Sequence, residues 1–285
     1  MQMKIRRFAL SHFQELIPLL LRCFPDFWEP RLAREQFSFP YDLKLFAGCL
    51  NGRPLACIGI HDYQIIMDGR VLPLGGLCDV CVDPDFRGLG FAYQLQDYVL
   101  HYCLAKTEYR AMPLYTDKPG VYRSRGWQQY EGKRSREISL ADFPPLNTFS
   151  LAGSSLDLRK IWRTGGDTLR PAEKIAREIT SIYQAGRVFD GKCLRSAKVW
   201  NELFAEPLHC WRLDKNTYFL YRGERLLEAY SRDESHPVNH FFPLQETPDG
   251  HQVMINILHS EDAAQNSLSA AIAAQQLVFP AADVF

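Results

Sequence analysis

A short loop with two glycines and an arginine forms the centre of the most informative segment of this chain. The loop, Arg87-Gly88-Leu89-Gly90, lies between the apolar run Val80–Val82, which Asp83-Pro84 ends, and an amphipathic segment that begins at Phe91. This order predicts a strand, a turn and a helix whose first N–H groups have no partner inside the helix. Those donors, the positive end of the helix dipole and glycines that admit a close approach to the backbone favour an anionic ligand. The segment therefore predicts a phosphate-binding loop.

Two common phosphate-binding fingerprints do not fit this loop. A dinucleotide-binding loop requires a further glycine where the chain has Tyr93, and the Gly-Lys-Ser/Thr ending of a nucleoside-triphosphate loop is missing. The segment instead resembles the acetyl-CoA signature of the GNAT N-acetyltransferase superfamily, Arg/Gln-x-x-Gly-x-Gly/Ala. Arg87, Gly90 and Ala92 stand at its defined positions, and Val82-Asp83-Pro84 matches the Val-x-Pro that commonly precedes it. The resemblance implies a GNAT fold and acetyl-CoA as the acyl donor.

The resemblance assigns acetyl-CoA binding to one continuous part of the chain. The loop and the start of the following helix would hold the diphosphate, with Arg87 supplying charge and paired donors. The strand before the loop would offer main-chain hydrogen bonds to the pantetheine arm if the sheet splays there. The residues assigned to acetyl-CoA are Val80, Cys81, Val82, Arg87, Gly88, Leu89, Gly90, Phe91 and Ala92.

A second motif follows after a short predicted strand. Tyr122-Arg123-Ser124-Arg125-Gly126-Trp127 resembles the Tyr-x-x-x-Gly-Phe segment of GNAT proteins, with Trp127 in the place of Phe. The resemblance implies that Tyr122 lies close to the thioester sulfur. A phenol with an ordinary pKa of about 10 is protonated at neutral pH and can donate its proton to the leaving thiolate. We therefore expect Tyr122 to be the general acid; the alternative is an aromatic residue that only packs on a short helix.

The group that accepts the proton of the amine has several candidates. Asp79 is a carboxylate in an otherwise apolar strand, and such a group seldom stays buried without a partner or a task. It could equally pair with an arginine or cap a loop. Asp117 and His61 are further candidates, and a water chain needs none of them. Some Eis-type GNAT proteins are thought to use their C-terminal carboxylate, which would be that of Phe285.

The acceptor pocket is predicted in an aromatic segment after the first helix. Aromatic rings with carboxylates suit a cationic amine through cation–π contacts and charge. A hydrophobic lid or a contact between domains is an equal alternative. The segment contains Asp26, Phe27, Trp28 and Glu29, with Phe37, Phe39 and Tyr41 further on.

Composition places the chain among soluble globular proteins with room for two domains. It has 285 residues, of which 46% are hydrophobic and 23% charged, and its 33 basic residues balance 33 acidic ones. That balance predicts neither a nucleic-acid nor a membrane partner. The eight cysteines lie mostly in apolar segments, which favours reduced thiols and the cytoplasm. Cys78 and Cys81 form a Cys-x-x-Cys without a second pair, so we expect buried thiols and no metal site.

The order of predicted elements indicates a mixed α/β (α+β) architecture. Hairpin strands precede the strand–loop–helix–strand unit, which predicts a mixed sheet flanked by helices. We expect a GNAT domain at 1–142, a linker at 143–152 and a smaller, degenerate GNAT-like α+β domain at 153–285, which resembles the second domain of Eis-type proteins. A strand predicted at Val253–Leu258 belongs to that second part.

These patterns predict an acetyl-CoA-dependent N-acetyltransferase. It would pass the acetyl group directly, in a ternary complex, to a primary amine of a small molecule or peptide. A non-catalytic acyl-CoA sensor or partner-binding protein is the alternative, because no base is obvious and the second part lacks a glycine loop of its own. An O-acyl or longer-acyl transferase is a third reading, and a homo-oligomer is left open.

Overall fold

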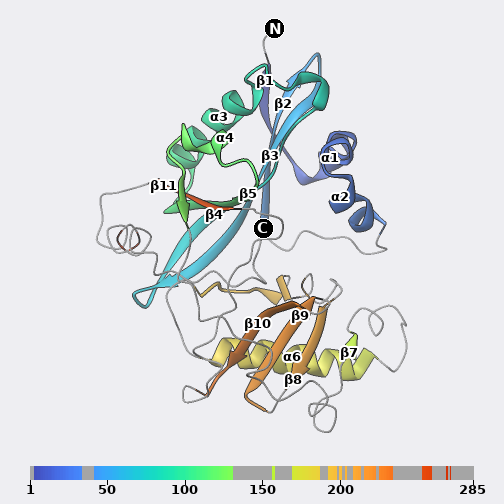
Figure 1. Cartoon of the computed structure of the whole chain (residues 1–285), viewed down its shortest axis with the longest axis vertical. Helices are drawn as coiled ribbons and strands as arrows, with labels where there is room; N and C mark the ends of the chain where they lie inside the picture. The colour runs from blue at the N-terminus through green and yellow to red at the C-terminus, as the bar shows by residue number, and fades with distance from the viewer. Residues whose placement is uncertain are drawn as a thin grey trace.

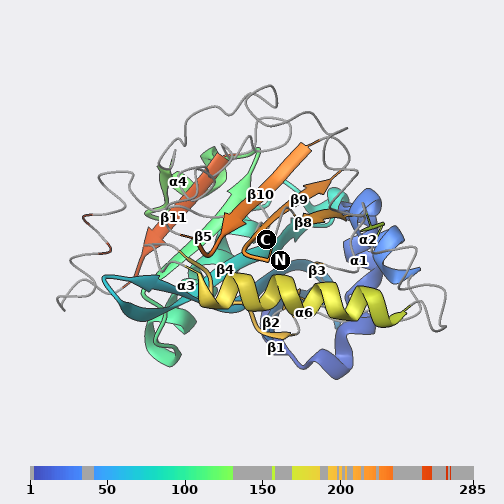
Figure 2. The same cartoon turned by 90° about the horizontal axis from the view of Figure 1, so that it is seen from below.

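In the computed structural model, the described residues are 3–33, 42–130, 156–157, 169–186, 192–197, 199–200, 203, 208–212, 215–222, 225–233, 252–258, 268 and 270. They form a seven-stranded and a four-stranded sheet, drawn from two directions in Figure 1 and Figure 2. The linker predicted at 143–152 and the residues Phe37, Phe39, Tyr41 and Phe285 lie outside the described ranges.

Antiparallel hairpins build the first half of the seven-stranded sheet. Each of its first four strands pairs antiparallel with the next one along the chain. The turns Asn51-Gly52 and Asp68-Gly69 have positive φ at both residues, as two-residue hairpin turns of this kind require. The four strands are β1 (Lys4–Phe8), β2 (Asp42–Leu50), β3 (Arg53–Met67) and β4 (Arg70–Val82).

A helix connects these hairpins to the rest of the sheet. α3 (Phe91–Lys106) follows β4, and β5 (Ala111–Thr116) returns parallel to β4. Two parallel neighbours must be joined by a crossover of this kind. The strand–loop–helix–strand unit expected around Gly88 and Gly90 is therefore present, and the mixed α/β sheet predicted from the sequence is confirmed.

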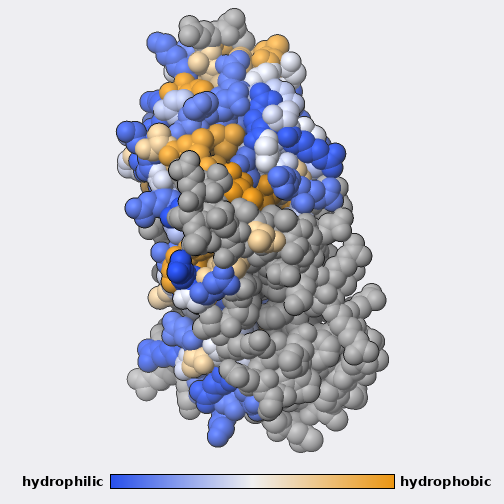
Figure 3. All heavy atoms as spheres, turned by 90° about the vertical axis from the view of Figure 1, so that its left-hand side faces the viewer, coloured by the Kyte–Doolittle hydropathy of each residue, from blue (hydrophilic) through white to orange (hydrophobic). Residues whose placement is uncertain are grey.

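Helices pack on both faces of this sheet (Figure 1). On one face α3 buries Leu95 and Val99 in a core that includes Phe46 of β2. On the other face Leu20 of the first helix packs in a core with Leu45 of β2. The side that carries α3 shows a band of hydrophobic surface among hydrophilic residues (Figure 3). The shorter helical elements are η1 (Leu10–Glu15), α1 (Ile17–Cys23), α2 (Pro25–Leu32), η2 (Pro84–Phe86) and α4 (Gly120–Arg123).

A strand from the far end of the chain completes the seven-stranded sheet. β11 (Gln252–Ile257) lies between β5 and β6 (Gln128–Tyr130) and runs antiparallel to both. Its residues fall in the range 153–285 that the sequence assigned to a second domain, so this range also supplies a strand to the first sheet. An alternating apolar pattern predicts a strand but does not say which sheet it joins. The other limits of the two domains stay a prediction.

The four-stranded sheet is antiparallel and lies in the second half of the chain. α6 (Leu169–Ala185) packs against it. A buried ion pair stabilises this part: Arg195 Nη1 donates to Glu228 Oε1 at 3.0 Å, and Tyr218 also donates to Glu228. The likeness of this unit to a second GNAT domain stays a prediction. Its strands, in spatial order, are β10 (Arg225–Ser231), β9 (Thr217–Arg222), β8 (Leu208–Arg212) and β7 (Leu156–Asp157).

A second connection between the two halves lies at the outer end of the β3–β4 hairpin. The N–H of Ile66 donates to the carbonyl of Lys192 at 3.0 Å, and the N–H of Leu194 donates to that of Gln64 at 2.9 Å. Residues of the second half thus add main-chain hydrogen bonds to β3. Within the ranges given above, no helix is both long and apolar enough to cross a membrane.

One buried amide in α3 generates a stability prediction. Gln96 is 0% exposed, and neither its side-chain nitrogen nor its oxygen has a hydrogen-bond partner among the described residues. Because a buried polar group without a partner costs about 1–3 kcal/mol, we expect Gln96→Leu to raise the free energy of unfolding by about 1 kcal/mol in urea titrations. The matched control, Gln94→Leu, makes the same change at an exposed position of α3 and should have little effect. A loss of stability in Gln96→Leu would contradict the prediction.

Candidate functional site

β4 is distorted shortly before the glycine loop. The register between β3 and β4 shifts so that Asp79 and Val80 together oppose Ile58. Asp79 has φ 51°, in the left-handed region that aspartate tolerates better than most residues. A β-bulge of this kind bends a strand and re-aims its side chains. The sequence predicted a strand through this segment but gave no sign of the bulge.

β4 and β5 also separate on the way to the loop. Their registered pair is Leu74 with Ala111, although β4 continues to Val82 and β5 to Thr116. Beyond Leu74, the edge of β4 that faces β5 therefore has no registered strand partner in the described structure. The binding of a pantetheine arm along this edge stays a prediction.

A buried carboxylate fixes the start of the loop. Asp83 Oδ1 accepts a hydrogen bond from the N–H of Asp85 at 3.1 Å. Its Oδ2 accepts from Arg22 at 2.9 Å and from Arg53 at 3.1 Å, and the side chain of Asp83 is 1% exposed. Arg22 also binds Asp85 at 2.9 Å. Asp83 thus ties the loop to α1 and to the start of β3.

The two loop positions require glycine because of their backbone conformation, and not because a side chain would collide with its neighbours. Gly88 has φ 76° and Gly90 has φ 77°. A Cβ at either position would meet no other atom within 4 Å, so open space lies beside both. Gly90 is the N-cap of α3, and no side chain caps this helix. Its first N–H groups therefore point to a ligand or to solvent.

Arg87 adds a positive charge at the same place. Its Nε donates to the carbonyl of Val82 at 3.2 Å, and the side chain is exposed. Together with the uncapped helix and the open space at the glycines, this arrangement fits an anionic diphosphate group.

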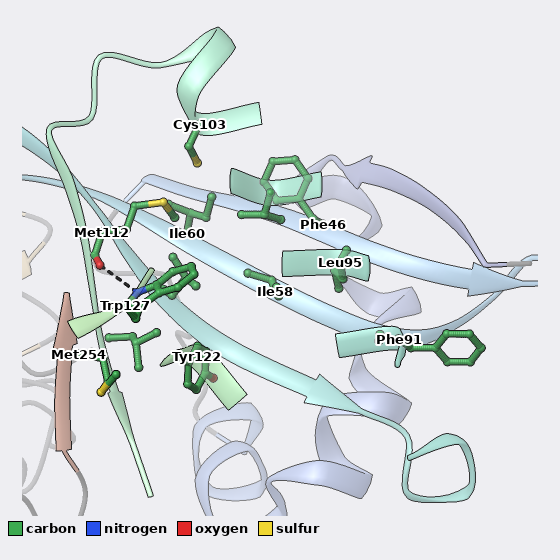
Figure 4. Packing of buried hydrophobic residues seen from close by; sticks show 14 of the residues in the cluster. Phe46, Ile58, Ile60, Phe91, Leu95, Cys103, Met112, Tyr122, Trp127 and Met254 are labelled. Carbon is green, nitrogen blue, oxygen red and sulfur yellow. Dashed lines mark hydrogen bonds between the residues drawn. The ribbon is translucent and has the colours of Figure 1, made fainter. Parts of the chain in front are cut away.

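Tyr122 lies on α4, where β4 and β5 part. Its side chain is 6% exposed, and its ring meets the ring of Trp127 edge-on with centroids 5.8 Å apart (Figure 4). Burial raises the pKa of Tyr122 to about 12, and a hydrogen bond with Thr116 opposes the rise, while Asp117 and Cys81 add to it. Tyr122 belongs to the same buried cluster as Leu77 of β4 and Leu114 of β5. The phenol keeps its proton at neutral pH.

The turn that follows Tyr122 is fixed by two neighbouring strands. Met112 of β5 and Asn256 of β11 are register partners. The Nε1 of Trp127 donates to the carbonyl of Met112 at 3.2 Å (Figure 4), and the Nδ2 of Asn256 donates to the carbonyl of Arg125 at 2.7 Å. Sequence reasoning missed Asn256, because no local pattern links residues 131 positions apart.

Asp79 is held by a tryptophan of α2. The Nε1 of Trp28 donates to Asp79 Oδ1 at 3.1 Å. Burial raises the pKa of Asp79 to about 6, and hydrogen bonds with Cys78 and Trp28 and the charge of Arg31 offset only part of the rise. A carboxylate with a pKa just below neutral is ionised at pH 7 yet basic enough to accept a proton.

The four residues predicted to bind the acceptor lie in different surroundings on α2. Trp28 is 2% exposed, so its indole supports Asp79 and presents no open face. Phe27 is 43% exposed, but the guanidinium of Arg31 already lies 3.5 Å from its ring centroid. Asp26 and Glu29 are exposed carboxylates. Their role toward an acceptor stays a prediction.

The other candidate bases are less well placed. Asp117 is exposed and pairs with Lys118. His61 is buried within β3, opposite Gly76, on the hairpin stretch before the bulge. Asp79 therefore combines partial burial, a hydrogen bond that orients it and a raised pKa in one group.

A comparison with protein families finds a match in the first part of the chain. Residues 4–130 match the family model described as an acetyltransferase (GNAT) domain. Over this segment, a little under half of its length, the chain is similar to a GNAT acetyltransferase domain. The segment contains the loop, Asp79 and Tyr122, and the prediction of an acyltransferase is confirmed at this level. A search of the curated proteins found no match.

Solved structures resemble the chain over most of its length. A GCN5-related N-acetyltransferase from Kribbella flavida has 14% identity and a TM-score of 0.53, with 90% of this chain and 71% of that chain covered. One from Anabaena variabilis ATCC 29413 has 14% identity, a TM-score of 0.54 and coverage of 90% and 73%. Eis1 from Mycobacterium abscessus has 12% identity, a TM-score of 0.53 and coverage of 91% and 74%. At these identities the likeness is one of fold, and it extends well past the segment that the family model matches.

The raised pKa of Asp79 generates a pH-dependent prediction. Between about pH 4 and pH 6 the folded protein binds more protons at Asp79 than the unfolded chain does, so its contribution to stability is present below about pH 4 and lost as pH rises through about 6. We expect Asp79→Asn to exceed the wild type in free energy of unfolding by about 2 kcal/mol near pH 7.5, and by much less near pH 4.

The asparagine variant is a close match in other respects. Asparagine also tolerates the left-handed region and still accepts from Trp28, so those effects do not change with pH. Urea unfolding at several pH values measures the difference. A gain in stability that is the same at every pH would show that Asp79 does not titrate with a raised pKa.

Proposed function

We propose that the chain is an acetyl-CoA-dependent N-acetyltransferase that passes the acetyl group directly to a primary amine of a small molecule or peptide. The proposal is carried by one observation: the uncapped start of α3, with open space beside Gly88 and Gly90, lies at the end of a strand that separates from its neighbour. This arrangement offers an anion site for a diphosphate, and next to it unpaired main-chain groups for an arm that carries amides.

The loop residues divide the task of holding acetyl-CoA. The N–H groups from Gly88 to Ala92 and the guanidinium of Arg87 would bind the diphosphate. Val80, Cys81 and Val82 would offer main-chain groups to the arm. The bound thioester supplies an activated acetyl group with a thiolate as leaving group.

Two side chains would manage the protons. Asp79, ionised at neutral pH, accepts the proton that the amine loses on attack. Tyr122 keeps its own proton at neutral pH, so its O–H is available to the sulfur as negative charge develops there. Burial raises both pKa values. The carboxylate of Asp79 thereby becomes a better base, and the phenol of Tyr122 stays protonated and able to act as an acid.

The acceptor would enter beside α2. The exposed carboxylates of Asp26 and Glu29 favour a cationic amine, and the part of the Phe27 ring that Arg31 leaves exposed adds apolar contact. Trp28 would act on the acceptor through Asp79, whose carboxylate it orients. The cysteines whose side chains are described are free thiols, which supports a reducing compartment such as the cytoplasm.

The first test removes the phenol oxygen. We expect Tyr122→Phe to lower turnover by about tenfold or more, as loss of a general acid does, while the affinity for CoA measured by calorimetry stays the same. Thiol release from acetyl-CoA with a panel of amines reports turnover. Tyr98→Phe, at an exposed position of α3, is the matched control. Unchanged turnover in Tyr122→Phe would exclude the acid role, and binding by the wild type without turnover of any amine would favour an acyl-CoA sensor.

The second test fills the space at the loop. Gly90→Glu places a carboxylate where the diphosphate would lie, so we expect acetyl-CoA affinity to fall about a hundredfold or more by calorimetry. Gly52→Glu is the control, because Gly52 also has positive φ and open space but lies in the β2–β3 hairpin. Equal affinities of the two variants would place the ligand elsewhere.

A further inference from the structure

Two thiols from different elements meet beneath the glycine loop. Cys23 ends α1, and Cys81 lies near the end of β4. Cys81 belongs to the buried cluster against which Cys23 packs, and the Sγ of Cys23 donates to the carbonyl oxygen of Val82, the residue after Cys81, at 3.6 Å. Cys81 is 8% exposed, whereas Cys23 is partly exposed and therefore open to a small oxidant.

The surroundings make Cys23 the reactive member of the pair. The hydrogen bond with Cys81 lowers the pKa of Cys23 to about 7, and Arg87 lowers it further through charge and a hydrogen bond, while burial and the charge of Asp83 oppose this. The pKa of Cys81 is raised by the same hydrogen bond and by burial, and burial raises that of the neighbouring Cys57 and Cys78. A partly exposed thiolate beside a basic residue and a second thiol is the usual setting of a redox-sensitive cysteine.

We propose that Cys23 and Cys81 are the site of a reversible disulfide, formed by a hydroperoxide, that weakens binding of acyl-CoA to the adjacent loop. The second half of this statement rests on the proposed function. The Cys-x-x-Cys pattern of the sequence pairs Cys81 with Cys78, but the fold gives Cys81 a different partner.

The chemistry balances with hydrogen peroxide as the oxidant. The Cys23 thiolate attacks one peroxide oxygen and the O–O bond breaks, which leaves a sulfenic acid on Cys23 and releases water once a proton is taken up. The sulfur of Cys81 then attacks the Sγ of Cys23, an S–S bond forms, the S–O bond breaks and a second water leaves. Overall, each thiol loses one electron and one proton, and the peroxide takes up the two electrons and two protons and becomes two waters.

The disulfide would act on the loop in two ways. It removes the ionisable thiol whose negative charge Arg87 favours, so the guanidinium beside the loop loses an electrostatic partner. It also draws the end of α1 toward β4. Arg22, next to Cys23 in the chain, binds both Asp83 and Asp85, so a shift of α1 is transmitted to the residues that begin the loop.

The experiment oxidises the full chain with hydrogen peroxide, blocks the remaining thiols and maps disulfides by mass spectrometry without reduction. We expect one cross-linked pair, Cys23 with Cys81, which dithiothreitol reverses. We also expect oxidised protein to bind acetyl-CoA about tenfold more weakly by calorimetry; acetyl-CoA is chosen because it has no free thiol. Cys103→Ser, which removes a buried thiol of α3, should still form the cross-link, whereas peroxide should no longer change the acetyl-CoA affinity of Cys23→Ser.

The outcomes separate the two proposals. A cross-link between other cysteines, or over-oxidation of Cys23 without a cross-link, would overturn the disulfide. A mapped Cys23–Cys81 disulfide with unchanged acetyl-CoA affinity would overturn its effect on the loop. Failure of the reduced wild type to bind acetyl-CoA would instead count against the proposed function, because the mapping does not depend on the ligand.

Discussion

The site depends on the separation of β4 from β5. If β4 paired with β5 as far as Val82, its main-chain groups would all be used within the sheet and none would be left for a ligand. The bulge at Asp79 and the last registered pair at Leu74 and Ala111 define where the separation develops. Unpaired main-chain groups are costly when buried, so the surrounding side chains must hold the two strands apart. Asp83, fixed by Arg22 and Arg53, anchors one side of the opening.

The parts of the site that the sequence could predict are those encoded by neighbouring residues. Glycines at 88 and 90 are needed for positive φ whatever the rest of the fold does, and a loop that leads into a helix leaves donors free by its geometry alone. Tyr122 and Gly126 likewise belong to one short segment. The mixed sheet followed from hairpin turns and one crossover, which are also local signals.

The parts that the sequence could not predict are contacts between distant segments. Trp28 looked like a ring for the acceptor, but the fold turns its N–H toward Asp79. Asn256 and Cys23 carried no signal, because their partners Arg125 and Cys81 lie far away in the chain. Pairing of strands and thiols across such separations is decided by packing of the whole sheet, which no window of residues contains.

The position of β11 has a consequence for how this protein must be synthesised. β5 leaves the ribosome long before residues 252–257 do. During translation the edge of β5 that will pair with β11 therefore has no partner strand. β6, three residues long, pairs with β11 as well. An exposed strand edge is a site for pairing with other chains. Nascent molecules therefore pass through an aggregation-prone interval, and a fragment cut at the border of the family match would remain in it permanently.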